Sequence, residues 1–292
     1  MTAIPEPFDP STLAVAAEAG DGAAAARLAV LTGMGLGVAP DWHRSLGWLG
    51  QAAELGFEPA MAEITLLAGR SATESWTEAV CRIDIAPWLN APRPRPLSDG
   101  PAIFAIDGFL LPAVCDWIVA RAAAMVAPAL VYDPDTGSGR RESARTNTAA
   151  QFDLGKMDVV LAIVRERIAR AVGMPVPGLE WTQVLHYAVG QTFDWHVDWL
   201  DPALPGYAAD LAIRGQRIAT LLVFLNDDFE GGETAFEAGN IRHRGRKGDA
   251  LLWANTLPDG SIDRRTRHAG LPPTKGEKWV LSQWLRGRAP TV

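Results

Sequence analysis

The stretch that decides the fold is YAVGQTFDWHVD, residues 187–198, taken together with His268 and Lys278 farther along the chain. Residues i and i+2 of an extended segment point to the same face, so His196 and Asp198 should project together. Two imidazoles and one carboxylate form a donor set that leaves coordination positions open on a non-haem Fe(II) ion. Because a His-x-Asp triplet also arises by chance, the surrounding sequence has to support the candidate ligands His196, Asp198 and His268.

Lys278 begins an apolar run, KWVLSQWL, which has the composition of a buried strand. Lysine side chains are normally solvated, and a lysine that faces a protein interior needs an anionic partner. We therefore predict that Lys278 points inward and meets an anion.

The composition bounds the class of protein. A chain of 292 residues, 48% hydrophobic and 21% charged, is typical of a globular protein with two domains, or with one large domain and an appendage. A formal net charge of −7 argues against a nucleic-acid partner, and the basic residues 242–247 are interpreted as a solvated loop.

Cysteine use and the N-terminus predict the compartment. Cys81 and Cys115 are far apart in sequence, so we expect no disulfide framework. The first ten residues, MTAIPEPFDP, lack a basic leader region, and no run of about 18 uncharged apolar residues occurs. The sequence therefore predicts a cytoplasmic protein without a membrane partner.

Residues 11–70 are rich in alanine, leucine and glycine, and they repeat at a spacing of 36 residues. AEAG at 17–20 aligns with AELG at 53–56, and a period of this length is typical of stacked helix pairs. With GLGVAPD at 35–41, the pattern resembles a Sel-like repeat of the tetratricopeptide type. We expect residues 1–86 to form this helical repeat domain; a plain alanine-rich helical cap is the alternative.

The composition changes between residues 87 and 101, where five prolines indicate a semi-rigid linker. The second domain is expected to cover residues 102–292. It should begin with a strand at 102–109 and contain amphipathic helices at 111–127 and 157–172. Between these helices, residues 132–148 form a long polar segment of the kind that often serves as a lid.

From residue 181 onward, short β-type runs alternate with turn residues. Such a series predicts a sandwich or jelly roll, so the whole chain is expected to be of the α+β class. The expected strands are 181–187, 192–199, 217–225, 233–236, 250–254, 267–269 and 278–286.

Six motifs lie in the second domain, together with Arg145-Thr146 in the long polar segment. They are I-D-x-F-L (106–110), Y-x-x-G-x-x-F-x-x-H-x-D (187–198), R-x-x-T-L-L-x-F-L-N-D-x-x-x-G-G-E-T-x-F (217–236), G-D-A-L-L-W (248–253), H-A-G-x-P (268–272) and G-x-K-W (276–279). In this order they resemble the prolyl 4-hydroxylase-like branch of the 2-oxoglutarate/Fe(II) oxygenases. The resemblance covers roughly residues 100–288.

The resemblance implies a double-stranded β-helix, a form of jelly roll, flanked by helices. It implies that His196, Asp198 and His268 bind Fe(II) and that Lys278 pairs with the C5 carboxylate of 2-oxoglutarate. Tyr187 and Thr220 are implied as further contacts to 2-oxoglutarate. O2 would be the second cosubstrate, and ascorbate is an additional candidate cofactor.

The substrate side departs from the family pattern at Arg267, before the distal histidine, and at Trp199, directly after Asp198. Several tryptophans could give the mouth of the site an aromatic character, although most tryptophans are simply core residues. We select Arg145, Trp199 and Trp284 as candidate substrate contacts.

The leading hypothesis is prolyl 4-hydroxylation of a protein or peptide, with release of succinate and CO2. Residues 1–86 are candidates for recruiting that substrate. Three alternatives stay open: hydroxylation of a free amino acid or other small metabolite, a non-catalytic module that senses iron or 2-oxoglutarate, and a scaffold in which the repeats are the main functional part. Intact His196, Asp198, His268 and Lys278 count against a silent module.

Overall fold

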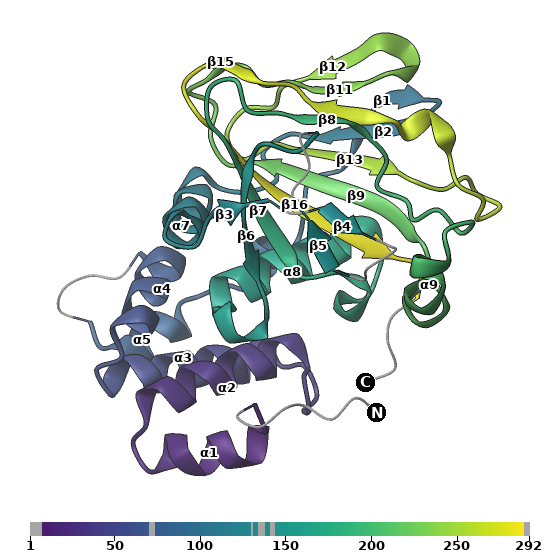
Figure 1. Ribbon diagram of the computed structural model, residues 1–292. Coiled ribbons are helices and arrows are strands. Elements are labelled where there is room, and N and C mark those ends of the chain that lie inside the picture. The colour runs from purple at the N-terminus through teal and green to yellow at the C-terminus, as the bar shows by residue number, and fades with distance from the viewer. Residues whose placement is uncertain (1–7, 70–73, 130, 134–137, 141–143, 289–292) are drawn as a thin grey trace. The chain divides into compact units, whose positions relative to one another are not determined.

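The computed structural model describes residues 8–69, 74–129, 131–133, 138–140 and 144–288 (Figure 1). Contacts divide the chain into two compact units. The first, here called the helical unit, contains the chain up to Ala91 and the segment Leu154–Val176. The second, here called the β unit, contains Pro92–Asp153 and the chain from Pro177 to Pro290. Among the described residues, no helix is both long enough and apolar enough to span a membrane.

The helical unit contains seven α-helices within the described residues. Helices α2 and α4 begin 36 residues apart, at Gly22 and Glu58, and α1 and α3 end 36 residues apart, at Glu18 and Glu54. This spacing agrees with the sequence period, although the Sel-like assignment stays a prediction. The helices are α1 (Pro10–Glu18), α2 (Gly22–Met34), α3 (Trp42–Glu54), α4 (Glu58–Ala68), α5 (Trp76–Cys81), α6 (Ala86–Leu89) and α8 (Val159–Val172).

Helix α8 packs with the N-terminal helices rather than with the sheets, although the sequence placed residues 157–172 in the second domain. The buried carboxylate of Glu63, on α4, accepts hydrogen bonds from the backbone N–H groups of Val159 and Val160 at 2.7 and 3.3 Å. Arg27, on α2, donates to the carbonyl oxygen of Leu154 at 2.7 Å. A carboxylate at a helix N-terminus satisfies donors that have no partner within the helix. These bonds fix the start of α8 within the helical unit.

The β unit consists mainly of two antiparallel sheets (Figure 1). The eight-stranded sheet has the order β1 (Arg95–Asp99), β2 (Ala102–Ile106), β13 (Ala250–Ala254), β9 (Arg217–Phe224), β16 (Lys278–Arg286), β7 (Thr182–Tyr187), β6 (Thr148–Phe152) and β3 (Ala127–Pro128). The four-stranded sheet has the order β12 (Ile241–His243), β11 (Thr234–Phe236), β14 (His268–Gly270) and β8 (Phe193–His196). This α+β architecture is consistent with the predicted jelly roll.

Smaller elements complete the β unit. They are helices α7 (Pro112–Ala123) and α9 (Ala208–Arg214) and the strand pairs β4 (Val131–Asp133) with β5 (Ser138–Arg140) and β10 (Glu230–Gly231) with β15 (Pro273–Lys275).

Two segments differ from their predicted structure. The proline-rich residues 87–101 are not simply a linker, because they contain most of α6 and the edge strand β1, which pairs with β2. The predicted lid at residues 132–148 contains β5 and parts of β4 and β6, while positions 134–137 and 141–143 lie outside the described residues.

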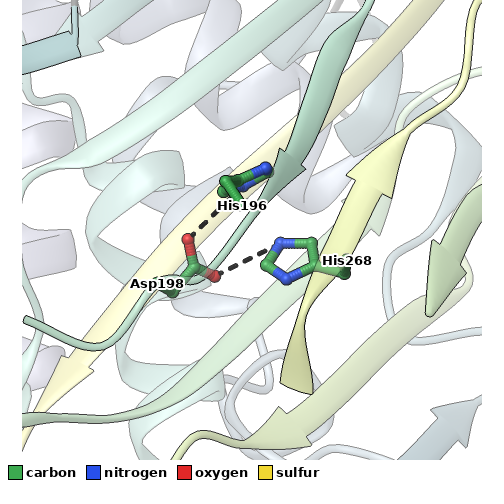
Figure 2. A group of neighbouring side chains, drawn as sticks. All are labelled: His196, Asp198 and His268. Carbon is green, nitrogen blue, oxygen red and sulfur yellow. Dashed lines mark ion pairs between the residues drawn. The ribbon is translucent and has the colours of Figure 1, made fainter. Parts of the chain in front are cut away.

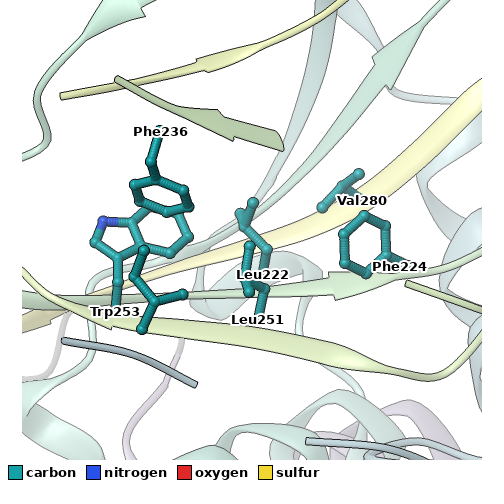
Figure 3. Close-up of a cluster of buried hydrophobic side chains, with 7 residues drawn as sticks. Leu222, Phe224, Phe236, Leu251, Trp253 and Val280 are labelled. Atoms are coloured by element: carbon teal, nitrogen blue, oxygen red, sulfur yellow. The ribbon is translucent and has the colours of Figure 1, made fainter. Parts of the chain in front are cut away.

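The core of the β unit is a cluster of apolar side chains that includes residues from both sheets (Figure 3). Phe236, on β11, meets Trp253, on β13, edge to face with ring centroids 5.3 Å apart. Alternate residues of a strand face opposite sides, so β9 presents Leu222 and Phe224 to this cluster together. The full cluster is Ile103, Leu222, Phe224, Phe236, Leu251, Trp253 and Val280. It gives the neighbouring polar site a rigid apolar support.

Candidate metal centre and cosubstrate pocket

A pocket lies in the β unit, lined by residues of both sheets. Its walls include parts of the apolar core, such as Leu222 and Trp253. Its polar and charged lining residues are Arg145, Tyr187, His196, Asp198, Thr220, Thr234, His268, Lys278 and Ser282. A mostly apolar cavity with a few convergent polar groups is the usual form of a small-molecule site.

Three of these residues converge on one point (Figure 2). His196, the last residue of β8, lies directly opposite His268, the first residue of β14, in the strand register. The Nε2 atoms of His196 and His268 lie 3.8 and 3.6 Å from the carboxylate oxygens of Asp198. One ligand atom from each residue lies within 4.8 Å of the others. This spacing allows the three side chains to hold a single metal ion.

Asp198 follows β8 and is not part of a strand, contrary to the extended segment that we predicted at 192–199. Its side chain nevertheless faces both histidines (Figure 2). The side chains of His196 and Asp198 therefore converge as predicted, although the segment is extended only as far as His196.

Backbone hydrogen bonds fix the orientation of both imidazoles. His196 Nδ1 bonds the carbonyl oxygen of Asp194 at 2.7 Å, and His268 Nδ1 bonds that of Thr266 at 2.9 Å. A carbonyl only accepts, so each Nδ1 carries a proton, and the Nε2 atoms are left as the candidate ligand atoms. Burial, with the neighbouring His268, lowers the pKa of His196 to about 3. His196 is therefore a neutral imidazole at physiological pH, the form that binds metals.

Asp198 is only 4% exposed, and its environment keeps it ionised. Burial alone would raise its pKa, but His268, His196 and a hydrogen bond from Thr220 outweigh burial and hold the pKa below its ordinary value. The Thr220 hydroxyl donates to Asp198 Oδ2 at 2.6 Å. Two imidazoles and one carboxylate are the donor set of a non-haem Fe(II) site.

Lys278 lies elsewhere in the same pocket and is 1% exposed. Within the described residues it forms no ion pair; its ammonium lies 5.1 Å from the ring centre of Tyr187, its partner in the strand register. Burial, opposed in part by Glu233, lowers the pKa of Lys278 to about 8. The burial of Lys278 agrees with the predicted inward-facing lysine. A buried cation without an ion-pair partner is a candidate position for an anion, and that role stays a prediction.

Thr234, on β11, is a residue to which we assigned no role from the sequence. Its hydroxyl is buried, lines the same pocket and has no hydrogen-bond partner within the described part of the chain. A hydroxyl and an ammonium with unused donor capacity suit a carboxylate. The signal was present in the sequence as the threonine of the G-G-E-T-x-F motif.

Tyr187 is buried, and burial raises its pKa to about 12, so its hydroxyl stays protonated as a donor. A Cβ atom at Gly270 would lie 3.1 Å from this hydroxyl oxygen, so glycine leaves the space that the tyrosine needs. Tyr187 lines the pocket, and its contact to the cosubstrate stays a prediction. Thr220 also lines the pocket, but its hydroxyl proton is directed to Asp198.

Comparison with known proteins decides the family. The model of the 2OG-Fe(II) oxygenase superfamily matches residues 182–286. Probable prolyl 4-hydroxylase 4 of Arabidopsis thaliana is 30% identical over 219 residues, which cover 68% of this chain and 72% of the relative. Prolyl 4-hydroxylase 5 of the same plant is 32% identical over 204 residues, covering 63% and 68%. The chain belongs to the 2-oxoglutarate/Fe(II) oxygenases, in their prolyl 4-hydroxylase-like branch.

A solved structure agrees with this assignment. The viral collagen prolyl hydroxylase of Paramecium Bursaria Chlorella virus-1, in its 2-oxoglutarate complex, is 26% identical with a TM-score of 0.50. The match covers 66% of this chain and 99% of the viral one. The protein is thus an oxidoreductase whose family requires Fe(II), 2-oxoglutarate and O2. Both the donor set at Asp198 and the buried Lys278 fit these groups.

The three candidate substrate contacts of this oxygenase differ in position. Arg145 and Trp284 line the pocket, and the Arg145 guanidinium lies 4.4 Å from the ring centre of Phe193. Trp199 is not among the lining residues; its ring lies 5.5 Å from the guanidinium of Arg264.

An ion pair that we did not anticipate supports this side of the pocket. Glu180 accepts two hydrogen bonds from Arg217, at 2.7 and 3.0 Å. The Arg217 guanidinium packs 3.7 Å from the ring centre of Trp284 and also donates to the carbonyl oxygen of Asp198 at 3.4 Å. Arg217 opens the R-x-x-T motif, but its partner lies 37 residues away in sequence and cannot be read from the motif.

Proposed function

We propose that this oxygenase hydroxylates a prolyl residue of a protein or peptide at C4 and releases succinate and CO2. The observation that carries the proposal is the likeness to prolyl 4-hydroxylases over two thirds of the chain, with the His-Asp-His group and Lys278 all in place. The position of the hydroxyl group and the class of substrate rest on the relatives.

The residues of the chain have distinct tasks in this reaction. His196, Asp198 and His268 would hold Fe(II), while Lys278 and Thr234 would bind the C5 carboxylate of 2-oxoglutarate. When bound, iron and 2-oxoglutarate would activate O2, which is the oxidant for C–H hydroxylation. The apolar walls at Leu222 and Trp253 exclude water from the reacting groups. Arg145 and Trp284 are the pocket residues that we propose contact the substrate.

The role of residues 1–86 is a separate proposal. The 36-residue helix spacing supports Sel-like repeats, and recruitment of a peptide is the function that we propose for them. Because parts of α2 and α4 hold α8, a peptide would have to bind the remaining helix surfaces. A role for ascorbate and a cytoplasmic location also stay proposals.

Incubation of the full chain with Fe(II), 2-oxoglutarate and proline-containing peptides tests the function. We expect succinate and a peptide that has gained one oxygen atom on proline, both absent with Asp198→Ala. Oxygen gained by a free amino acid or metabolite of a cell extract, with no peptide modified, would favour the small-molecule alternative. Tight 2-oxoglutarate binding without succinate would favour a sensing module.

A further inference from the structure

Asn255 follows directly after β13 and is completely buried. Its Nδ2 atom donates to the Thr220 hydroxyl oxygen at 2.9 Å, and that hydroxyl donates to Asp198 Oδ2 at 2.6 Å. Two backbone bonds hold Asn255 in place: its N–H donates to Ile218, and its carbonyl accepts from Asp263. A chain of two hydrogen bonds thus leads from a fixed amide to the carboxylate of the metal centre.

The chemistry of a hydroxyl gives this chain a direction. A threonine hydroxyl has one hydrogen and accepts through its lone pairs. Because the amide of Asn255 donates to the oxygen, the hydrogen of Thr220 is left for Asp198. With the amide turned over, the carbonyl oxygen of Asn255 would compete for that same hydrogen. The observed orientation is the one in which Asp198 receives it.

This orientation of the Asn255 amide leaves a buried acceptor unsatisfied in the described part of the chain, which favours a functional role for the residue. Asn255 Oδ1 is buried and has no hydrogen-bond partner within the described residues. An unsatisfied buried acceptor destabilises a fold, and such groups call for a specific explanation. An apolar residue of similar size would avoid that cost but could not orient Thr220.

We propose that Asn255 is a positioning residue of the metal centre, which acts through Thr220 to orient the carboxylate of Asp198 and so increases metal affinity. The inference rests on the ligand assignment in the proposed function, but not on the identity of the substrate. Groups that orient metal ligands typically contribute about 10- to 100-fold to metal affinity.

The test is Co(II) binding to the full metal-free chain, measured by competition with a fluorescent chelator. Asn255→Ala and the near-isosteric Asn255→Leu should each weaken Co(II) binding about 10-fold, and Thr220→Val should weaken it at least as much. The decisive arm is the double variant Asn255→Ala/Thr220→Val. If Asn255 acts through Thr220, the double variant binds Co(II) as weakly as Thr220→Val alone.

Two results would overturn the proposal: wild-type Co(II) affinity in both Asn255 variants, or losses that multiply in the double variant. Multiplying losses would mean that Asn255 merely supports the fold. Should Asn255→Ala not fold, Asn255→Leu carries the same comparison. Asp198→Ala tests the ligand assignment separately from the role of Asn255, because wild-type Co(II) affinity in that variant would refute the ligand assignment itself.

Discussion

The metal centre and the lysine end of the pocket differ in how their polar groups are satisfied. At the metal centre, His196 and His268 each bond a backbone carbonyl, and Asp198 receives the Thr220 hydroxyl. At the other end, Lys278 has no ion pair and Thr234 no hydrogen bond within the described residues. Ligands of a metal must be held in one geometry beforehand, whereas groups that meet a carboxylate keep their donors free for it.

The largest effect should come from the metal centre. Asp198→Ala removes the only carboxylate of the three-residue group, so we expect metal affinity to fall more than about 100-fold, beyond the effect of an orienting group. Succinate formation should become undetectable. Asp194→Asn is a matched control, because Asp194 lies at the same distance in sequence on the other side of His196 and bonds it only through its backbone carbonyl. Equal activity of the two variants would contradict the ligand assignment.

The next largest effect should come from Lys278. Leaving one partner of a buried ion pair alone costs about 3–5 kcal/mol, so Lys278→Met should weaken 2-oxoglutarate binding roughly 100- to 4000-fold. Co(II) affinity should not change. The control is Lys275→Met, at an exposed lysine paired with Glu230 on the surface, which should bind 2-oxoglutarate as the wild type does.

The same substitution should raise stability. Without 2-oxoglutarate, Lys278 is a buried charge with no ion pair within the described residues, and methionine removes its desolvation cost. Thermal unfolding of the ligand-free protein should therefore occur at a higher temperature in Lys278→Met than in the wild type. A lower unfolding temperature would mean that Lys278 already has a stabilising partner in the ligand-free protein.

A smaller effect is expected at Thr234. Thr234→Val keeps the shape but removes one hydrogen bond to a charged group, worth about 1.5 kcal/mol. We expect 2-oxoglutarate affinity to fall roughly 10-fold, with unchanged Co(II) affinity. Titration calorimetry would measure both, and an unchanged affinity for 2-oxoglutarate would remove Thr234 from the carboxylate site.

The smallest effect that we expect near neutral pH is a change of 2-oxoglutarate affinity with pH. The pKa of Lys278 in the ligand-free protein is about 8, below its ordinary value of 10.5. Below pH 8 the lysine is charged, so 2-oxoglutarate affinity should not change with pH. Above pH 8 binding must take up a proton, so affinity should fall by up to about tenfold per pH unit.

The stability of the ligand-free protein should also depend on pH. The unfolded chain holds more protons between pH 8 and 10.5, so this lysine makes ligand-free stability rise with pH there. Both dependences should disappear in Lys278→Met.

The sequence predicted the residues of the site better than the long-range hydrogen bonds that hold the structure around them. The ligands and Lys278 lie in short motifs with characteristic spacing, and the β-type runs from residue 181 onward predicted the jelly roll. The hydrogen bond from Asn255 to Thr220 spans 35 residues, and the bond from the Val159 N–H at the start of α8 to Glu63 spans 96. Local patterns carry no information on such long-range pairs. The placement of α8 in the second domain failed for that reason, and a deletion of residues 1–90 would also remove its partners Arg27 and Glu63.

We propose that this oxygenase binds the two carboxyl ends of 2-oxoglutarate at two different places, with Lys278 at the far one. The most direct measurement compares 2-oxoglutarate with 2-oxobutanoate, which has the same keto acid head but no far carboxylate. Both are titrated into the Co(II)-loaded wild type and Lys278→Met. We expect the wild type to bind 2-oxoglutarate far more tightly than 2-oxobutanoate, and Lys278→Met to bind both with similar, weak affinity. A Lys278→Met protein that keeps the full preference for 2-oxoglutarate would show that Lys278 does not bind the far carboxylate.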